Sequence, residues 1–599
     1  MSEHGIYGFA GRVLFADLDS GSHRTEALNR EWCEESLGGF GMNLRLYESL
    51  AQPGCDPLSA DSRLILGAGP LVGTLAPGAS RVMATARFPL TGAVASACGG
   101  MGLGAQIKWA GYDHLVIRGR ATQPSYLLVE DRGVRVIAAP ELWGRDTHET
   151  TAELWSRHPG SSVACIGQAG ENQVCSALAI IDMSSTLGRG GLGAVMGAKL
   201  LKAIVVRGSG GVAVADPDRF MQAVDGLHRR LRSWPRRERA LQLGMMASYP
   251  GLEPAYLSVK RGRAACPSCF VGDKDVLGLP GEPPSSFTTS CTSYLNAMLL
   301  GLLLDLDLRE QVLILDLLDR LGLCFISFMN MALFLRDLAA HGLLQPGDLE
   351  LPDMSGAQAL DGFRFLANLA WGIALKQGAG TVLAAGWRAA LAHFGPEAER
   401  FAITVKGQDC LYDPRVSGLG TMEFEQVVSP RGPTSASSGS PTYSPGTPLP
   451  DFPRHAARMG ATPEAVERIC AGGDLNVGRL TRYSEDWFSL FSSLGICNRA
   501  QNNRFYNIEV ISELFSAGTG MQAGPRDLMD RAAASWELYR ALNRREGFSE
   551  ADDRAPAQWF REDEVWRRAG RMEDYFHRRA VTAAEMDRLL EDYRDERSR

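Results

Sequence analysis

The chain has 599 residues, a formal net charge of −7 and a pI of about 5.9, so it lacks the basic excess typical of nucleic-acid binders. Hydrophobic residues make up 45% and charged residues 22%, which excludes a disordered chain, a collagen and a coiled coil. The most apolar stretch, 295–304, ends at Asp305, and residues 1–13 show no signal-peptide pattern. We therefore expect a cytoplasmic protein of several domains without a membrane span.

The first third of the chain has the pattern of a strand-rich domain. From residue 7 to about residue 209, short β-branched and apolar runs alternate with Gly, Pro, Asp and Ser. From residue 216 onward the apolar residues recur with a helical period, which predicts a helical second part and an α+β fold. The expected strands include 12–15, 64–66, 82–86, 114–117 and 203–206, and the expected helices are 218–234, 295–321, 329–341, 356–377 and 380–393.

Two later stretches differ in composition from these helices. Eight prolines lie among Ser, Thr and Gly between residues 413 and 453, which predicts a long unstructured segment, either a functional loop or a disordered excursion. The tail from residue 537 is rich in Arg, Asp and Glu and is expected to be a solvated helical face.

Two glycine-rich segments lie where strands meet turns. One runs from 67 to 104, and the other includes Gly188, Arg189, Gly190, Gly191 and Gly193. Glycine permits positive φ and close approach of backbone amides, so a Gly-Arg-Gly-Gly run suits a nest for a phosphate with an arginine fork. Tight β-turns explain the same glycines without any ligand.

Most of the twelve cysteines lie singly, which favours a reducing compartment over a disulfide scaffold. The exception is Cys266-Pro-Ser-Cys269, a CxxC spacing that suits half a zinc knuckle, a redox pair or part of an iron–sulfur site. A zinc ribbon requires a second CxxC, and the sequence has none. Cys497 is a candidate distant ligand, because iron–sulfur clusters often take one cysteine from far along the chain.

Several motifs together resemble the aldehyde ferredoxin oxidoreductase family, and the resemblance extends over essentially the whole chain. It implies a β-rich N-terminal domain over 1–209, a helical domain with the CxxC over 210–405 and a second helical domain over 406–599. It also implies a tungsten or molybdenum bis-pterin cofactor and one four-iron four-sulfur cluster. The matching segments are 7–12, 68–74, 88–92, 108–113, 166–172, 188–197, 319–324, 412–415 and 494–497.

The resemblance assigns roles residue by residue. Arg81 resembles the arginine between pterin and cluster, and Gly99 the glycine beside a pterin. Cys266, Cys269 and Cys497 match three of the four cluster ligands. The other implied cofactor contacts are Arg189, Gly190 and Gly193 in a phosphate-proximal turn, Asp319, Leu323 and Cys324 in a DxxGL(C/D) pattern, and the pair Arg431 and Gly432.

The chain departs from the family pattern at several positions. Asp273 stands where the family has the third cysteine of CxxCxxxC, so a weak carboxylate ligand or a three-iron cluster is expected. The second DxxGL motif has Ser492 in place of aspartate, although Asp486 is close in sequence. The catalytic glutamate is replaced by Thr or Tyr within 288–294, and the histidine falls near Ser435. The usual proton-transfer pair for aldehyde oxidation is therefore absent from its expected positions.

Two further cysteines bear on the metal site. In the tungsten subunit of class II benzoyl-CoA reductases, which resembles this family, a cysteine ligates the metal, and Cys291 lies in the corresponding region. Cys324 stands where some family members have aspartate. For each, the alternative is an ordinary buried thiol.

We therefore expect an oxidoreductase that oxidises an aldehyde, or reduces an activated acid, a thioester or a ring. Ferredoxin or an iron–sulfur subunit is the expected electron partner, and an oligomer is compatible with the sequence. The alternative is a degenerate homologue with a structural or assembly role, which the missing Glu, His, Cys and Asp favour and the retained arginines and cysteines oppose.

Overall fold

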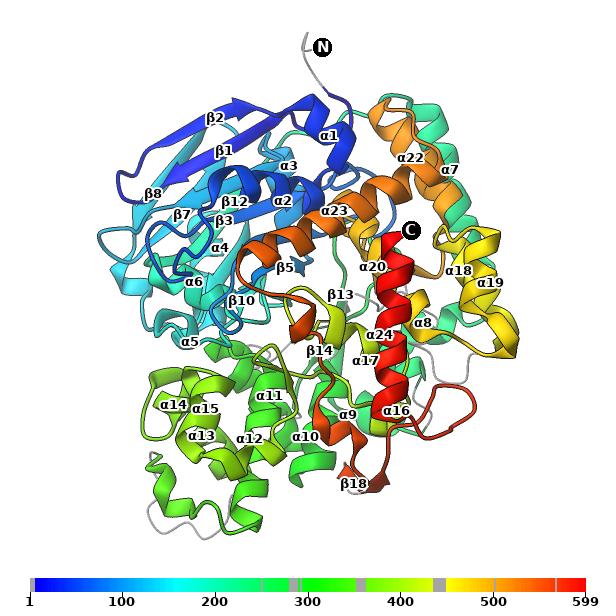
Figure 1. The fold of residues 1–599 in the computed structure, drawn as a ribbon. Coiled ribbons are helices and arrows are strands. Elements are labelled where there is room, and N and C mark those ends of the chain that lie inside the picture. Colours follow the sequence, from blue (N-terminus) through cyan, green and yellow to red (C-terminus); the bar gives the residue numbers. More distant parts are fainter. Residues whose placement is uncertain are drawn as a thin grey trace.

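The computed structural model describes residues 6–248, 251–279, 289–290, 293–351, 362–434, 449–499, 503–565 and 568–599. The N-terminal part forms two six-stranded sheets, which confirms the expected strand-rich domain (Figure 1). The first has the order β2-β1-β6-β3-β4-β5. Its strands are β1 (Arg12–Asp17), β2 (His23–Ala27), β3 (Leu64–Ala68), β4 (Val82–Arg87), β5 (Val94–Gly99) and β6 (His114–Arg118).

The second sheet packs on the first through alternate apolar side chains. Leu66 and Val82 of the first sheet share one hydrophobic cluster with Leu127 and Ile204 of the second. The strand order is β11-β10-β9-β12-β7-β8. Its strands are β7 (Ser125–Glu130), β8 (Gly133–Ala138), β9 (Ser162–Ile166), β10 (Ala179–Ile181), β11 (Ser185–Leu187) and β12 (Leu201–Arg207), and the helices of this part are α1 (Arg30–Ser36), α2 (Gly39–Leu50), α3 (Leu103–Trp109), α4 (Thr147–Arg157), α5 (Gln168–Glu171) and α6 (Leu192–Ala198).

The middle of the chain is helical, but two expected helices are each divided in two. Asp305 has a φ of 57°, and the side chain of Asp307 caps a new helix by accepting the Glu310 amide. Gly386, with a φ of 91°, divides 380–393. The helices are α7 (Pro217–Arg232), α8 (Arg237–Leu243), α9 (Glu253–Val259), α10 (Ser293–Leu304), α11 (Leu308–Leu321), α12 (Phe325–Ala340), α13 (Gly362–Leu375), α14 (Gly380–Ala384) and α15 (Trp387–Phe394).

The expectation of one unstructured segment over 413–453 is wrong for its first part. Asp413 caps a short helix with Pro414 at its first position, and the helix that follows is buried along its whole length. The remainder, 435–448, lies outside the described residues. The helices are α16 (Pro414–Ser417), α17 (Thr421–Val428), α18 (Phe452–Arg458), α19 (Pro463–Ile469), α20 (Val477–Leu494), α22 (Ile508–Thr519), α23 (Pro525–Arg545) and α24 (Ala583–Ser598), and short strands are β13 (Lys260–Ala264), β14 (Lys274–Leu277), β15 (Thr289–Ser290), β16 (Thr404–Val405), β17 (Gln408–Asp409), β18 (Asp563–Val565) and β19 (Arg568–Gly570).

The C-terminal helix has a solvated face, as expected, but its other face is buried and is held by ion pairs. α24 packs along α20, the helix that precedes Cys497 (Figure 1). Arg597 Nη1 lies 2.5 Å from Asp486 Oδ1, and the Tyr593 hydroxyl donates to Glu485 Oε2 at 2.7 Å. Asp486 is therefore bound to α24. Among the described residues, no helix is long and apolar enough to cross a membrane.

Replacing Arg597 with alanine should lower the free energy of unfolding by about 2 kcal/mol, because it removes the nearer of the two cations paired with the buried Asp486 carboxylate and leaves only Arg482, at 3.3 Å. The matched control is Arg599→Ala, which removes an exposed pair with Asp595 and should cost under about 1 kcal/mol. Urea denaturation followed by circular dichroism measures both. Equal denaturation midpoints for the two variants would show that α24 is not held by this pair.

Candidate functional site

The CxxC motif lies in the turn between β13 and β14, docked on the N-terminal domain. The Cys269 amide donates to the Cys266 carbonyl at 3.0 Å, and Ser268 between them has a φ of 57°. The Gly78 amide donates to the Ser268 carbonyl at 2.7 Å, while Ser268 Oγ donates to the Thr74 carbonyl at 2.7 Å. These bonds attach the turn to the segment 74–79.

Cys497 reaches the same segment from the other end of the chain. It follows the C-terminus of α20, where Gly495 takes the left-handed conformation. Its amide donates to the Gly78 carbonyl at 2.9 Å, and Ile496 pairs with Ala79. The structure thus brings Cys497 and the CxxC turn onto one loop of the N-terminal domain.

Arg81 is buried where the CxxC turn and Cys497 meet. We call Cys266, Cys269 and Cys497 together the thiol group. Arg81 Nη2 donates to Cys497 Sγ at 2.9 Å, and Cys266 Sγ accepts the Met101 amide at 3.2 Å. Burial lowers the pKa of Arg81, but the negative charges of the Cys497, Cys98 and Cys266 thiolates, in that order, raise it well above its usual value. Its Nε has no hydrogen-bond partner among the described residues. The guanidinium is suited to stabilise thiolates or a further anion.

Asp273 is buried and follows Cys269 by four residues. Burial, followed by the charges of Asp273 and Cys497, raises the pKa of Cys269 to about 11, although the Gly272 amide, which donates to the sulfur at 3.3 Å, opposes the shift. No three His, Cys, Asp or Glu side chains in the described part of the chain are placed to hold a single metal ion. A cluster of several irons separates its ligands more widely than one ion does.

The Arg189 turn has the backbone that the glycines predict. Gly188, Gly190 and Gly191 have φ of 94°, 107° and 110°. Arg189 Nη2 contacts Asp409 Oδ2 at 2.5 Å, and Nη1 donates to the Pro433 carbonyl at 3.1 Å. Burial lowers the pKa of Arg189, but the charge of Asp409 and the neighbouring Cys324 thiol raise it above its usual value.

Asp409, which the sequence analysis did not identify, organises this region. Its Oδ1 accepts bonds from Ser327 Oγ at 2.9 Å and Trp387 Nε1 at 3.0 Å. Its Oδ2 accepts Asn330 Nδ2 at 2.8 Å as well as Arg189. The buried carboxylate therefore joins the Arg189 turn to α12 and α15. Its four partners come from three separate segments, so no local motif signals it.

A set of unpaired buried polar atoms gathers beside the turn. Arg431 donates Nη2 to the Arg189 carbonyl at 2.6 Å and Nη1 to the Ser96 carbonyl at 3.1 Å. A Cβ on Gly190 would lie 3.5 Å from Gln408 Oε1 and 3.7 Å from Arg431 Nη2. Gln408 Oε1, Arg189 Nε and Arg431 Nε have no hydrogen-bond partner among the described residues. Buried polar atoms are normally paired, so this set fits a polar ligand at the turn.

The remaining predicted residues take structural positions nearby. Leu323 is buried and pairs with Ala177, and the Asp319 carbonyl accepts Thr147 Oγ1 at 2.9 Å. A Cβ on Gly193 would meet the Leu178 carbonyl at 2.5 Å, so that glycine permits close helix packing. Gly99 ends β5, Gly432 has a φ of 91°, Cys324 caps α12, and Cys291 lies outside the described residues.

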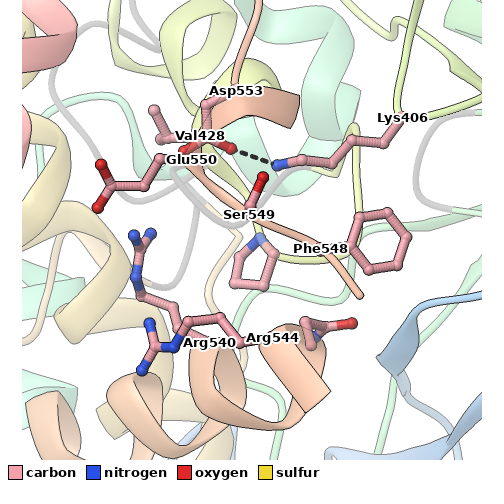
Figure 2. A pocket seen from close by; sticks show the side chains of 10 residues that line it. Lys406, Val428, Arg540, Arg544, Phe548, Ser549, Glu550 and Asp553 are labelled. Atoms are coloured by element: carbon pink, nitrogen blue, oxygen red, sulfur yellow. Dashed lines mark hydrogen bonds and ion pairs between the residues drawn. The ribbon is translucent and has the colours of Figure 1, made fainter. Parts of the chain in front are cut away.

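Two cavities lie outside the group of Cys266, Cys269 and Cys497. The larger, about 760 Å³, has Cys410 in its lining together with Asn330 and Trp387, which both donate to Asp409. Figure 2 shows the smaller, about 60 Å³, where Lys406 ion-pairs with Asp553 at 2.6 Å near Arg540. The larger cavity is of a size that accepts small organic ligands.

Family models match nearly all of the chain. Residues 13–208 match the N-terminal domain of aldehyde ferredoxin oxidoreductase, and residues 239–598 match its domains 2 and 3. The chain belongs to the aldehyde ferredoxin oxidoreductase family. It is accordingly an oxidoreductase.

Two curated members of the aldehyde ferredoxin oxidoreductase family illustrate the similarity. The tungsten-containing aldehyde ferredoxin oxidoreductase of Pyrococcus horikoshii is 32% identical over 454 residues, which cover 69% of this chain and 72% of the relative. That of Pyrococcus furiosus is 39% identical over 233 residues, 38% of each chain. A solved structure, the active-site complex BamBC of benzoyl coenzyme A reductase with 1,5-dienoyl-CoA, superposes with a TM-score of 0.84 at 22% identity, covering 99% of this chain and 95% of that chain. This likeness confirms the fold.

Proposed function

We propose that this oxidoreductase oxidises an aldehyde, or reduces an activated acid or thioester, and exchanges electrons with ferredoxin or an iron–sulfur subunit. The observation that carries the proposal is the contact of buried Arg81 with Cys497 beside Cys266, which joins three separate segments at one thiol group. Such a group is suited to an iron–sulfur cluster. The comparisons give no support to the non-catalytic alternative.

The residues present fit a bis-pterin cofactor. Arg189, Arg431 and Gln408 would bind its polar and phosphate groups with the atoms that have no partner within the described residues. Gly99, Gly190, Gly193, Gly432, Asp319, Leu323 and Cys324 would line the site, and Cys291 is proposed as a thiolate ligand of its metal. When bound, tungsten or molybdenum would supply two-electron chemistry that the cluster divides into single electrons.

The described residues limit which side chains can act as acid or base in the reaction. Asp409 accepts four hydrogen bonds, so it positions the Arg189 turn and is not free to take a proton from substrate. The family's glutamate and histidine positions fall within 288–294 and near 435, partly outside the described residues. We therefore assign no catalytic acid or base, and leave aldehyde oxidation and acid reduction as the two candidate directions.

Location, assembly and domain limits are part of the same proposal. The described cysteines are all free of disulfides, which suits a reducing, cytoplasmic compartment. Domain limits at about residues 209 and 405 remain our proposal, as does assembly into an oligomer.

Protein purified anaerobically from a metal-replete host should contain about one tungsten or molybdenum and about four iron atoms per chain. Elemental analysis and fluorescence of the oxidised pterin measure this directly. A folded preparation with neither metal and no pterin would contradict the proposed function and favour a structural subunit.

A further inference from the structure

Cys98 lies on the strand that leads to the cofactor-side glycines, and its direction follows from that strand. A Cβ on Gly99 would lie 2.4 Å from Ile181 Cδ1, and Ala97 belongs to the same cluster between the two sheets. Side chains alternate along a strand, so Cys98 points to the opposite face. There it packs against a different hydrophobic cluster, which also contacts Cys269 and contains Ile496.

The opposite face is the one on which the thiols lie. A Cβ on Gly100, two residues beyond Cys98, would lie 2.9 Å from Cys266 Sγ and 3.3 Å from Arg81 Nη1. Strand pairing of Val82 with Gly99 places Arg81 beside Gly100, next to Cys98. Cys98 therefore shares one face with Arg81 and Cys266.

The same guanidinium brings Cys497 to this face, because Arg81 Nη2 donates to Cys497 Sγ at 2.9 Å. Cys98 therefore lies on the strand face where Arg81, Cys266 and Cys497 meet.

We propose that Cys98 is the fourth sulfur ligand of the iron–sulfur cluster, in place of the family cysteine that is Asp273 here. This inference rests on the proposed function. A soft thiolate binds iron of such clusters more firmly than a hard carboxylate does. On ligation the Cys98 thiol loses its proton to solvent, and Arg81 offsets the added negative charge.

The test compares Cys98→Ser with Asp273→Ala, and uses Cys55→Ser as the control for a thiol outside the group. All are purified anaerobically as holoenzyme, and iron per chain, Mössbauer and electron paramagnetic resonance spectra are recorded. We expect the iron content of Cys98→Ser to fall from about four to about three atoms per chain, with the spectroscopic signal of a three-iron cluster. Asp273→Ala and Cys55→Ser should keep about four iron atoms per chain. Adding Asp273→Cys to Cys98→Ser should restore four irons, which separates a lost corner from misfolding.

An unchanged cluster in Cys98→Ser, or loss of iron in Asp273→Ala alone, would overturn the assignment while leaving the proposed function standing. Wild-type protein with neither iron nor tungsten or molybdenum would instead overturn the proposed function. Failure of the Asp273→Cys rescue would overturn the assignment, since it would show that the serine variant loses iron by distortion of the fold.

Discussion

Cys497→Ser should abolish the cluster and lower turnover with a ferredoxin-type acceptor at least 100-fold, the largest effect expected for one substitution in this chain. The sulfur accepts a hydrogen bond from Arg81 at 2.9 Å, and its backbone is tied to Gly78. Serine keeps the volume but is a poor iron ligand. It also removes the sulfur that accepts the hydrogen bond of the buried Arg81 cation.

The measurement is iron per chain together with the reduced-state paramagnetic signal. Cys470→Ser is the matched control, because Cys470 ends α19 and takes no part in the thiol group. The control should keep its iron and its activity. Full iron content in Cys497→Ser would exclude Cys497 from the cluster.

The second large effect is expected at the pterin side. Arg189→Ala should lower pterin and tungsten or molybdenum content at least tenfold, because the fork that faces the unpaired polar atoms is lost and Asp409 loses its cation. Arg189→Lys should recover part of the content, since it restores charge without the two-pronged geometry.

Arg388→Ala is the control for this series. Arg388 donates to the carbonyls of Thr91 and Lys406, away from Asp409 and the unpaired polar atoms. Circular dichroism should show the helix content of all three variants unchanged. An Arg189→Ala protein that binds the cofactor at the wild-type level would show that the turn is structural.

The strands of the N-terminal domain were predictable from local pattern. The runs at 64–66, 82–86 and 203–206 are short, apolar and bounded by turn residues, and each lies within an observed strand. The helix breaks at Asp305 and Gly386 were not anticipated, because the apolar period continues across both, although positive φ at both residues and the Asp307 cap separate the helices in the structure.

Amino-acid composition led to partly wrong expectations for two segments, because it does not show which residues meet in the fold. Proline and serine around residues 413–434 suggested an unstructured loop, but Asp413 and Pro414 start a helix there. The charges of α24 suggested exposure, yet Arg597 is buried against Asp486 from a distant helix. From sequence alone a charged residue is expected to be exposed, because its ion-pair partner is not known. Whether a partner distant in sequence lies beside it depends on how the helices pack.

The sequence by itself determined the fold class, the family and the Gly-Arg-Gly-Gly turn, because these depend on local periodicity, on motif order and on residues that permit positive φ. Only the tertiary structure decided which groups meet. It placed Cys266 and Cys497 at Arg81, and it made Asp409 the joint between the Arg189 turn and two helices. It also placed Cys98 on the same strand face as Gly100, which lies beside Arg81 and Cys266, because the face of a strand that is buried against a given partner depends on sheet pairing and on packing between segments far apart in the chain.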